Sequence, residues 1–262
     1  MNFFTPAEIC ENMVNGCNNK AKLSIGKMLV LGIFAGMFIS FGAYGFTIIT
    51  AAAGTGFEAT FAKLLGAGVF PVGLMLVVLC GAELFTGNNL MTLSVFKKEI
   101  TWGAMLRNWG VVWIANLIGS IAIAYLMSKS GLYGEAMVTK AIAIAEAKCA
   151  IPLGPVIIRA IFCNILVCLA VWMASASKDV IGKIFAMWFP IMLFVFSGFE
   201  HSVANMFFIP MGLFCGADIT WGQIFLNNII PVTFGNIIGG AIIIPIAYHY
   251  SYAKKAPVDA KK

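Results

Sequence analysis

The amino-acid sequence predicts an all-α membrane protein with six transmembrane helices, arranged as an inverted 3+3 repeat whose second and fifth helices are broken. Three observations lead to this fold class. Hydrophobic residues make up 61% of the 262 residues and charged residues 11%, whereas a soluble domain has about 25% charged residues. The apolar residues form runs that reach the roughly 20 residues needed for a helix to cross a bilayer. Two of these runs contain the same polar interruption.

The interruptions belong to an internal duplication. Residues 81–88 and 198–205 both read Gly-x-Glu-x-x-x-small-Asn. Downstream, Ile-Thr-Trp-Gly occupies both 100–103 and 219–222, and Asn-x-Ile-Gly occupies both 116–119 and 236–239. The offset between the copies drifts only from 117 to 120 residues. Three crossings per copy leave the second copy facing the opposite way, which makes the repeat inverted.

The expected elements form a single transmembrane domain over residues 1–262. Residues 5–8 are a capping-box pattern with Pro at the first helical position, so residues 1–24 are expected to hold a cytoplasmic amphipathic helix. We expect this helix to lie on the membrane surface with Phe3, Phe4, Ile9 and Met13 inward. The first repeat then covers 28–128, the second covers 154–250, and a basic cytoplasmic tail covers 251–262.

The six apolar runs are the predicted spans, and residues 128–155 form a long connection between the third and the fourth. In order, the spans are expected at 28–53, 65–96 with a break at 83–89, 103–127, 156–176, 183 onward with a break at 200–205, and 221–248. Backbone at membrane depth leaves a helix only where protein or a water-filled cavity satisfies it. Each break is therefore predicted to line a pore.

The distribution of Lys and Arg predicts the orientation. The terminal segments and the loops after spans two and four hold twelve of these residues, and the opposite side holds five: Lys63, Lys129, Lys140, Lys148 and Arg159. Basic residues are enriched on the cytoplasmic side of membrane proteins. We therefore expect a multi-pass protein of a bacterial inner (cell) membrane with both termini cytoplasmic, and we interpret the net charge of +6 as a topology signal and not as a nucleic-acid-binding surface.

The sequence shows no pattern for a metal, cofactor or catalytic centre. Its seven cysteines are scattered, mostly within apolar runs, with no Cys-x-x-Cys or Cys/His ligand spacing, so neither a disulfide framework nor a structural metal is expected. The sequence shows no arrangement of nucleophile and base that is typical of a catalytic centre, although residues close only in space are invisible at this level. We expect neither an enzyme nor a bound cofactor.

Comparing the two copies separates scaffold from mechanism. Glu83 and Glu200 match, as do Asn88 and Asn205, so the favoured interpretation is that they satisfy backbone groups freed at the two breaks. Proton transfer by these carboxylates is the less favoured alternative. The copies differ at three positions, where Leu84 pairs with His201, Phe85 with Ser202 and Thr86 with Val203. One histidine and one threonine therefore remain for a single pore.

His201 has two interpretations. It is either a core histidine bonded to Glu200 or to the backbone, or a side chain that faces the cavity, and we favour the cavity because ionisable groups inside a membrane usually mark a pathway. An imidazole can donate a hydrogen bond to an anion or pass it a proton near neutral pH. The other histidine, His249, lies at the end of span six and is expected at the surface.

Three stretches carry a resemblance to a known family. Residues 83–88 (Glu-Leu-Phe-Thr-Gly-Asn), 163–170 (Cys-Asn-Ile-Leu-Val-Cys-Leu-Ala) and 198–206 (Gly-Phe-Glu-His-Ser-Val-Ala-Asn-Met) resemble the signatures of the formate/nitrite transporter family. The resemblance implies an aquaporin-like fold and a pentamer with one pore per subunit, which passes small monovalent anions such as formate, nitrite or hydrosulfide. Within the family, residues 87–89 are most similar to the loop of the clostridial hydrosulfide channel.

The resemblance also implies roles for single residues. His201 matches the central pore histidine, and Thr86 matches a gating residue opposite it, although an ordinary loop hydroxyl is the plainer interpretation. Asn164 either bridges two helices or donates to the anion, and the sequence leaves this open. Lys148, by itself an ordinary solvated lysine, is placed at the outer vestibule, where a positive charge would concentrate anions. Residues that match pore constrictions are Phe70, Leu74, Leu84, Phe85, Val167 and Phe194.

The function predicted from the sequence is a membrane channel for small monovalent anions of weak acids. Its expected partners are those anions, the lipid bilayer and four further copies of the chain. The alternative is an aquaporin-like pore for small neutral solutes, which would not need His201.

Overall fold

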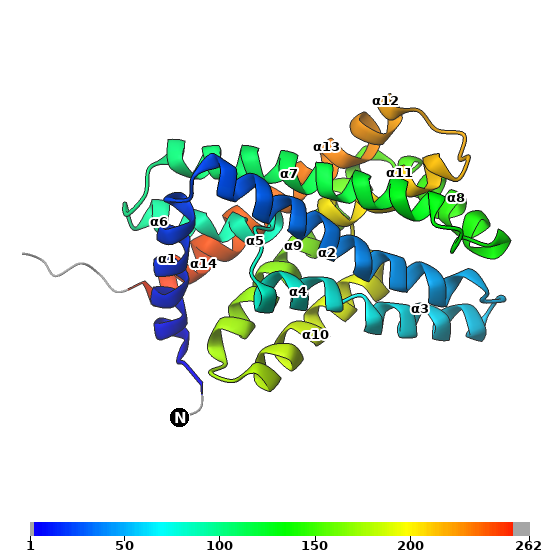
Figure 1. The fold of residues 1–262 in the computed structure, drawn as a ribbon. Helices are drawn as coiled ribbons and strands as arrows, with labels where there is room; N and C mark the ends of the chain where they lie inside the picture. Colours follow the sequence, from blue (N-terminus) through cyan, green and yellow to red (C-terminus); the bar gives the residue numbers. More distant parts are fainter. Residues whose placement is uncertain (1–2, 254–262) are drawn as a thin grey trace, which may run out of the picture.

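The computed structural model describes residues 3–253, and these are almost entirely helical. Within these residues, six helices are long and apolar enough to cross a membrane, and they pack side by side in one bundle (Figure 1). This confirms the predicted fold class. The spans are α2 (Ile25–Ala51), α3 with α4 (Phe57–Val69 and Val72–Cys80), α7 (Trp102–Lys129), α9 (Leu153–Ala176), α10 (Val180–Ser197) and the segment Trp221–Tyr252. The predicted basic tail lies mostly outside the described residues.

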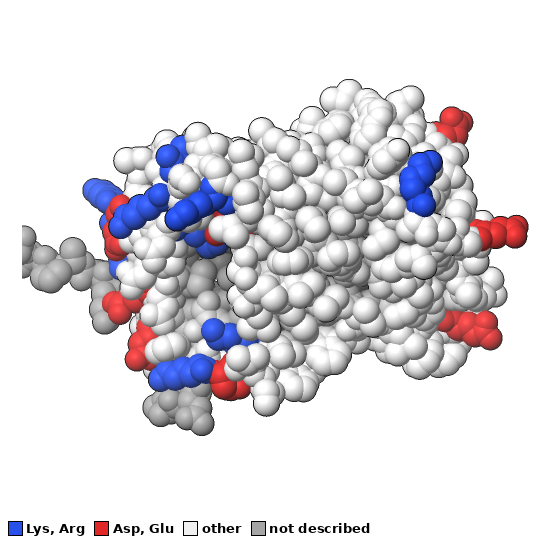
Figure 2. All heavy atoms as spheres, in the orientation of Figure 1, with Lys and Arg blue, Asp and Glu red and all other residues white. Residues whose placement is uncertain are grey.

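On the face drawn in Figure 2, the charged side chains gather at the two ends of the helix bundle. Figure 2 shows a wide belt without charged residues between them, with Lys and Arg concentrated at the end that carries α1. Such a belt is what a bilayer core requires, because a charged side chain facing lipid is costly.

Close helix crossings that depend on glycine occur in both repeats. In the first repeat, a Cβ at Gly36 would collide with the carbonyl oxygen of Asn116, and a Cβ at Gly119 with that of Ile33. In the second repeat, a Cβ at Gly239 would collide with the carbonyl oxygen of Ile161. Small residues allow membrane helices to approach closely. These crossings fix α2 against α7, and α9 against the last span.

Both broken helices stop at a glycine with positive φ. α4 ends at Gly81 (φ +84°), and helical structure resumes with α5 (Phe85–Asn88), continuing through η1 (Asn89–Met91) and α6 (Thr92–Phe96). α10 ends at Gly198 (φ +74°), and α11 (Ser202–Phe214) follows. Glycine adopts these angles without a Cβ penalty. The residues left outside the helices, Ala82–Leu84 and Phe199–His201, come to the middle of the bundle.

The amphipathic helix α1 (Pro6–Ala21) differs from the expectation in what it covers. Its capping box forms as predicted. α1 crosses one end of the bundle (Figure 1) and buries Ile9, Cys10, Val14 and Cys17 within the hydrophobic core of the protein. Phe3 is instead 55% exposed. The apolar face of α1 therefore packs mainly on protein. The ends of the membrane-spanning helices beneath α1 present an apolar surface, and α1 covers it.

A second short helix lies in the predicted long connection. α8 (Glu135–Cys149) precedes α9 as α1 precedes α2, and it packs on α11 at the opposite end of the bundle. The sequence gives little sign of it, because its buried residues are small ones, Ala141, Ala145 and Cys149. Each repeat is thus preceded by a short helix that covers one end of the bundle.

The last span is irregular. It runs through α12 (Trp221–Gln223), η2 (Ile224–Ile229), α13 (Ile230–Ile237), η3 (Ile238–Ile243) and α14 (Ile244–Tyr252), where η2 and η3 are π-helical. Pro231 and Pro245 follow these two segments. Proline lacks the N–H that an α-helical turn needs, so the wider turns accommodate it.

Candidate functional site

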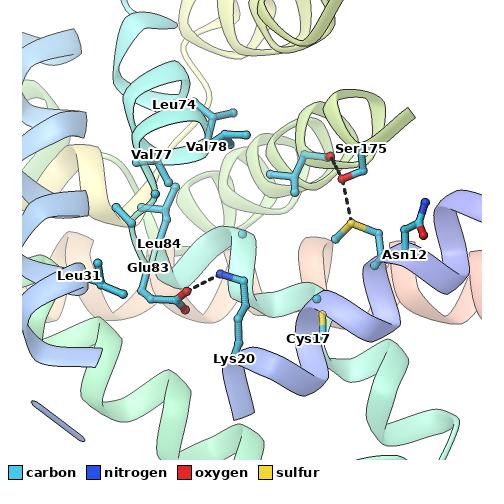
Figure 3. A pocket seen from close by; sticks show the side chains of 16 residues that line it. Asn12, Cys17, Lys20, Leu31, Leu74, Val77, Val78, Glu83, Leu84 and Ser175 are labelled. Carbon is cyan, nitrogen blue, oxygen red and sulfur yellow. Dashed lines mark hydrogen bonds and ion pairs between the residues drawn. The ribbon is translucent and has the colours of Figure 1, made fainter. Parts of the chain in front are cut away.

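Two cavities open from opposite ends of the bundle toward the two breaks. The Lys20 vestibule, about 470 Å³, lies under α1, and its lining includes Lys20, Leu74, Glu83 and Leu84. Figure 3 shows Lys20 reaching from α1 toward Glu83, with Leu74 and Val77 on the facing helix. The Lys148 vestibule, about 330 Å³, lies under α8 at the other end, and its lining includes Lys148, Phe194, Glu200 and His201.

A central space of only about 10 Å³ lies between the vestibules. It shares Leu74 and Leu84 with the Lys20 vestibule, and Phe70, Phe194 and His201 with the Lys148 vestibule. Ile39, Val167 and Ile191 complete its lining. About 10–15 Å³ is needed for one water molecule, so the path is tightly constricted here. His201 is the one polar side chain among the residues that line the central space.

His201 is held by one hydrogen bond at each ring nitrogen. It is the N-cap of α11, and its Nδ1 accepts from the backbone N–H of Ala204 at 3.0 Å. In a neutral imidazole the other nitrogen then carries the proton. Nε2 lies 2.8 Å from Thr86 Oγ1, to which it donates. The two predicted pore residues, one from each break, thus form a buried pair across the middle of the protein.

Five of the six predicted constriction residues line the central space, and Phe85 does not. Phe70 and Phe194 pack edge to face with ring centroids 5.6 Å apart, and the His201 ring stacks on Phe194 at 5.7 Å. Leu74, Leu84 and Val167 face the central space. Phe85 instead packs edge to face on Trp109 at 6.1 Å and is absent from the linings of all three spaces.

Asn164 bridges elements and does not face the path. Its Nδ2 lies 2.8 Å from Asn89 Oδ1, 2.8 Å from the Asn236 carbonyl oxygen and 3.3 Å from the Thr86 carbonyl oxygen. The residue is fully buried and lines none of the three spaces. These contacts favour the bridging alternative, in which Asn164 fixes the backbone of Thr86.

The glutamates belong to two matching clusters. In the Lys20 cluster, Glu83 accepts from Lys20 Nζ at 2.6 Å and from Asn88 Nδ2 at 2.7 Å. Asn88 Nδ2 also donates to Asn108 Oδ1 at 2.8 Å. A buried carboxylate is tolerated when it is paired and hydrogen-bonded. The repeat therefore encodes a neutral ion pair held by two asparagines.

The Lys148 cluster repeats this arrangement at the second break. Glu200 accepts from Lys148 Nζ at 2.8 and 3.0 Å and from Asn205 Nδ2 at 2.6 Å. Asn205 Nδ2 donates to Asn228 Oδ1 at 2.7 Å. The Lys148 side chain is 17% exposed, so it is a paired cation in the vestibule wall. It does not have the free, solvated ammonium group that the sequence suggested.

Other asparagines satisfy the backbone at the breaks, a task that the sequence assigned to the glutamates. Asn116 Oδ1 accepts from the Phe85 N–H, while its Nδ2 donates to the carbonyls of Gly32 and Glu83. Asn236 repeats these three bonds with the Ser202 N–H and the carbonyls of Ala160 and Glu200. Both asparagines belong to the duplicated Asn-x-Ile-Gly motif. Their task depends on contacts over 31 to 84 residues, which the pattern does not encode.

His249 lies apart from this site. It is half-buried at the α1 end, with its ring 5.7 Å from that of Phe96. Within the described residues, no group of three or more His, Cys, Asp and Glu side chains is arranged to hold a metal ion.

The fold and the site define a helical membrane protein with a constricted path between two vestibules. The chain belongs to the formate/nitrite transporter family, because the family model described as "Formate/nitrite transporter" matches residues 7–250. It is 43% identical to a probable formate transporter of Methanothermobacter thermautotrophicus, over 97% of this chain and 98% of the relative. It is 38% identical to the formate channel FocA of Escherichia coli K12, over 87% of each chain.

A solved structure described as a pentameric formate channel with formate bound has the same fold. It superimposes with a TM-score of 0.78 at 34% identity, covering 88% of this chain and 98% of that one. The narrower similarity to hydrosulfide channels stays a prediction.

Proposed function

We propose that the protein is a pentameric channel for small monovalent anions of weak acids, with formate, nitrite and hydrosulfide as candidate substrates. The observation that carries this proposal is His201, the one polar side chain in the otherwise apolar lining of the central space. It is bonded at 2.8 Å to Thr86, which is fully buried and lines none of the three spaces itself. Such a pair supplies hydrogen-bond donors at the point where an anion has lost its water. The relatives named for formate support the substrate class.

The constriction explains why donors are needed there. Moving a bare anion past Phe70, Phe194 and Leu84 removes its hydration, which costs far more than moving the neutral acid. The central space is too small for an anion, so passage requires these side chains to move. The Nε2–H of His201 and the hydroxyl of Thr86 can then exchange their mutual bond for bonds to the anion.

The cap of α11 favours His201 as a hydrogen-bond donor over a proton source. A neutral His201 gives up a proton easily only after Nδ1 has gained one, and Nδ1 is the atom that accepts from Ala204. Protonation there would break the cap and place a positive charge at a helix N-terminus, which its dipole disfavours. We therefore propose that His201 stabilises the anion, with proton transfer as the competing outcome of the test.

Flux into liposomes tests the proposal. Formate, nitrite, hydrosulfide and glycerol would be compared across pH 5 to 8, with protein-free vesicles as the control. We expect flux of at least one anion and none of glycerol. Glycerol flux without anion flux would support the neutral-solute pore instead. Gel filtration with light scattering of the detergent-solubilised protein tests the pentamer.

We also propose that the α1 end faces the cytoplasm of a bacterial cell. The charge count of the sequence and the concentration of Lys and Arg at the α1 end (Figure 2) support this orientation. Fusion of a fluorescent protein to the C-terminus should give a fluorescent cell, whereas an alkaline phosphatase fusion at the same site should be inactive. The opposite pair of results would reverse the topology.

A further inference from the structure

The net charge of the Lys148 vestibule does not come from Lys148. Among the residues that line it are three cations, Lys63, Lys148 and Arg159, and one acidic residue, Glu200. Because Glu200 binds Lys148 at 2.8 Å, that pair contributes no net charge. Lys63 and Arg159 remain, and neither forms a salt bridge in the part of the chain that the structure describes.

Both cations lie beside the second break. The ammonium of Lys63, on α3, lies 5.7 Å from the centroid of the Phe196 ring, and 3.9 Å from where a Cβ would lie on Gly198. Arg159, on α9, accepts a hydrogen bond from the Glu200 N–H through its backbone carbonyl at 3.4 Å. Lys63 and Arg159 thus lie on two different spans, both beside the segment that ends at His201 and both in the lining of the vestibule.

The acidic residues at this end lie elsewhere. Glu58, Glu135, Glu146 and Asp218 belong to the α8 end of the chain, and none of them lines the vestibule. Three of the five cations at this end line the cavity, against one of the five acidic residues. A concave, low-dielectric wall with charge of one sign raises the local concentration of the opposite ion. The arrangement therefore favours anions inside the vestibule.

We propose that Lys63 and Arg159 form an anion-binding site in the Lys148 vestibule, which captures the substrate before it reaches His201. This inference rests on the proposed function. The planar guanidinium of Arg159 suits an anion with two oxygen atoms, since it donates two parallel hydrogen bonds. The site therefore binds formate and nitrite in preference to hydrosulfide, which offers a single sulfur atom.

The first experiment measures flux into liposomes at 10 mM and 500 mM salt. The variants are Lys63→Gln, Arg159→Gln and the pair combined, and the matched control is Lys140→Gln, which removes a lysine from the same end but outside the lining. The combined variant should lose formate flux about tenfold at low salt and much less at high salt, because salt shortens the reach of charges. Equal flux in the combined and control variants would overturn the proposal.

Arg159→Lys separates geometry from charge. It keeps the positive charge but removes the two parallel N–H donors of the guanidinium, so formate and nitrite flux should fall relative to hydrosulfide flux. If all three anions keep their ratio, Arg159 has no role in selectivity and that part of the proposal is wrong.

Binding is measured separately from transport. Saturation-transfer NMR with formate reports weak binding to the detergent-solubilised protein. The parent and the Lys140→Gln variant should transfer saturation to formate, and the combined variant should transfer much less. Binding lost in the combined variant supports the site even if no protein shows flux, in which case the proposed function fails alone. Identical transfer in all three proteins would show that formate does not use this site.

Discussion

The two helix breaks have the same scaffold and different contents. Each has a glycine stop, a Lys–Glu pair held by two asparagines, and a third asparagine that satisfies the backbone. They differ in the three residues that follow the glutamate, which are Leu, Phe and Thr at the first break and His, Ser and Val at the second. The duplicated residues hold the breaks open at membrane depth. The residues that differ include His201 and Thr86, which form a single hydrogen-bonded pair between the two breaks.

The vestibules differ in the same way. The lining of the Lys20 vestibule includes one lysine and one glutamate, which bind each other, so its charges balance. The Lys148 vestibule adds Lys63 and Arg159 to the equivalent pair. An anion would thus meet an attractive vestibule at one end and a neutral one at the other. The duplicated residues therefore account for the shared scaffold, and the residues that differ between the copies account for the difference in charge between the two ends.

The largest expected effect comes from breaking the ion pairs. Glu200→Ala leaves Lys148 unpaired in a site where its side chain is 17% exposed, whereas Glu83→Ala leaves Lys20, which is 33% exposed. Breaking a buried pair costs about 3–5 kcal/mol, and exposure lowers that cost. Glu200→Ala should therefore reduce the yield and thermal midpoint of the detergent-solubilised protein more than Glu83→Ala. Normal yield with abolished flux would instead make the carboxylates part of transport.

Substitution of Lys148, the cation of the Lys148–Glu200 pair, distinguishes a structural ion pair from a free cation in the vestibule. A free vestibule cation would make Lys148→Gln slow anion uptake mainly at low salt. The paired lysine predicts a loss of stability similar to that of Glu200→Ala, and any loss of flux per folded protein should be independent of salt. A salt-dependent loss of flux in a fully stable protein would return the steering role to Lys148.

His201→Asn tests the donor pair without disturbing the break. Asparagine is a good N-cap, so it can still accept from the Ala204 N–H while losing the bond to Thr86. Formate flux should fall about tenfold, the equivalent of one hydrogen bond of about 1.4 kcal/mol, with no loss of folded protein or of its oligomeric state. Val203→Thr, at the position that matches Thr86 in the repeat, is the control. If His201→Asn transports normally but loses its pH dependence, proton transfer by His201 is favoured over the donor role.

The two glycine stops should tolerate alanine differently. Gly198 lies in the left-handed helical region (φ 74°, ψ 32°), where alanine costs roughly 1–2 kcal/mol. Gly81 (φ 84°, ψ 101°) lies outside every region open to residues with a Cβ. Gly81→Ala should therefore lower the thermal midpoint of the solubilised protein more than Gly198→Ala does. Equal shifts would mean that the first break relaxes when it is substituted.

The smallest effect concerns the starts of the two broken spans. Asp179 caps α10, and the hydrogen bond from the Gly182 N–H lowers the pKa of its exposed carboxyl below 3.8, whereas Gly56 gives α3 no side-chain cap. A carboxyl whose pKa is lower in the folded protein than in the unfolded chain stabilises the folded state at pH values above the unfolded pKa. This contribution is lost as the pH falls through the pKa of the folded state. Asp179→Asn should keep the cap but reduce the loss of thermal midpoint between pH 6 and pH 3. An unchanged pH profile would assign the loss to other carboxyls.

The sequence by itself determined the six spans, their inverted repeat and the two breaks. Hydropathy and the duplicated Gly-x-Glu pattern are local properties, so they can be read without knowing which helices meet. The positions of His201 and Thr86 also followed from the chain, once the two copies were compared and the family motifs were seen. The start of α1 was readable for the same reason, since a capping box lies within four residues.

Only the tertiary structure decided the partners. Lys148 meets Glu200 across 52 residues, and Thr86 meets His201 across 115. The role of Asn164 as a bridge, and the meeting of Lys63 and Arg159 in one cavity, depend on α3 and α9 packing around the same break. A buried polar group takes whichever partner the packed helices bring within about 3 Å. Which partners come within reach is therefore set by the helix crossings, which depend on glycines such as Gly36 and Gly239.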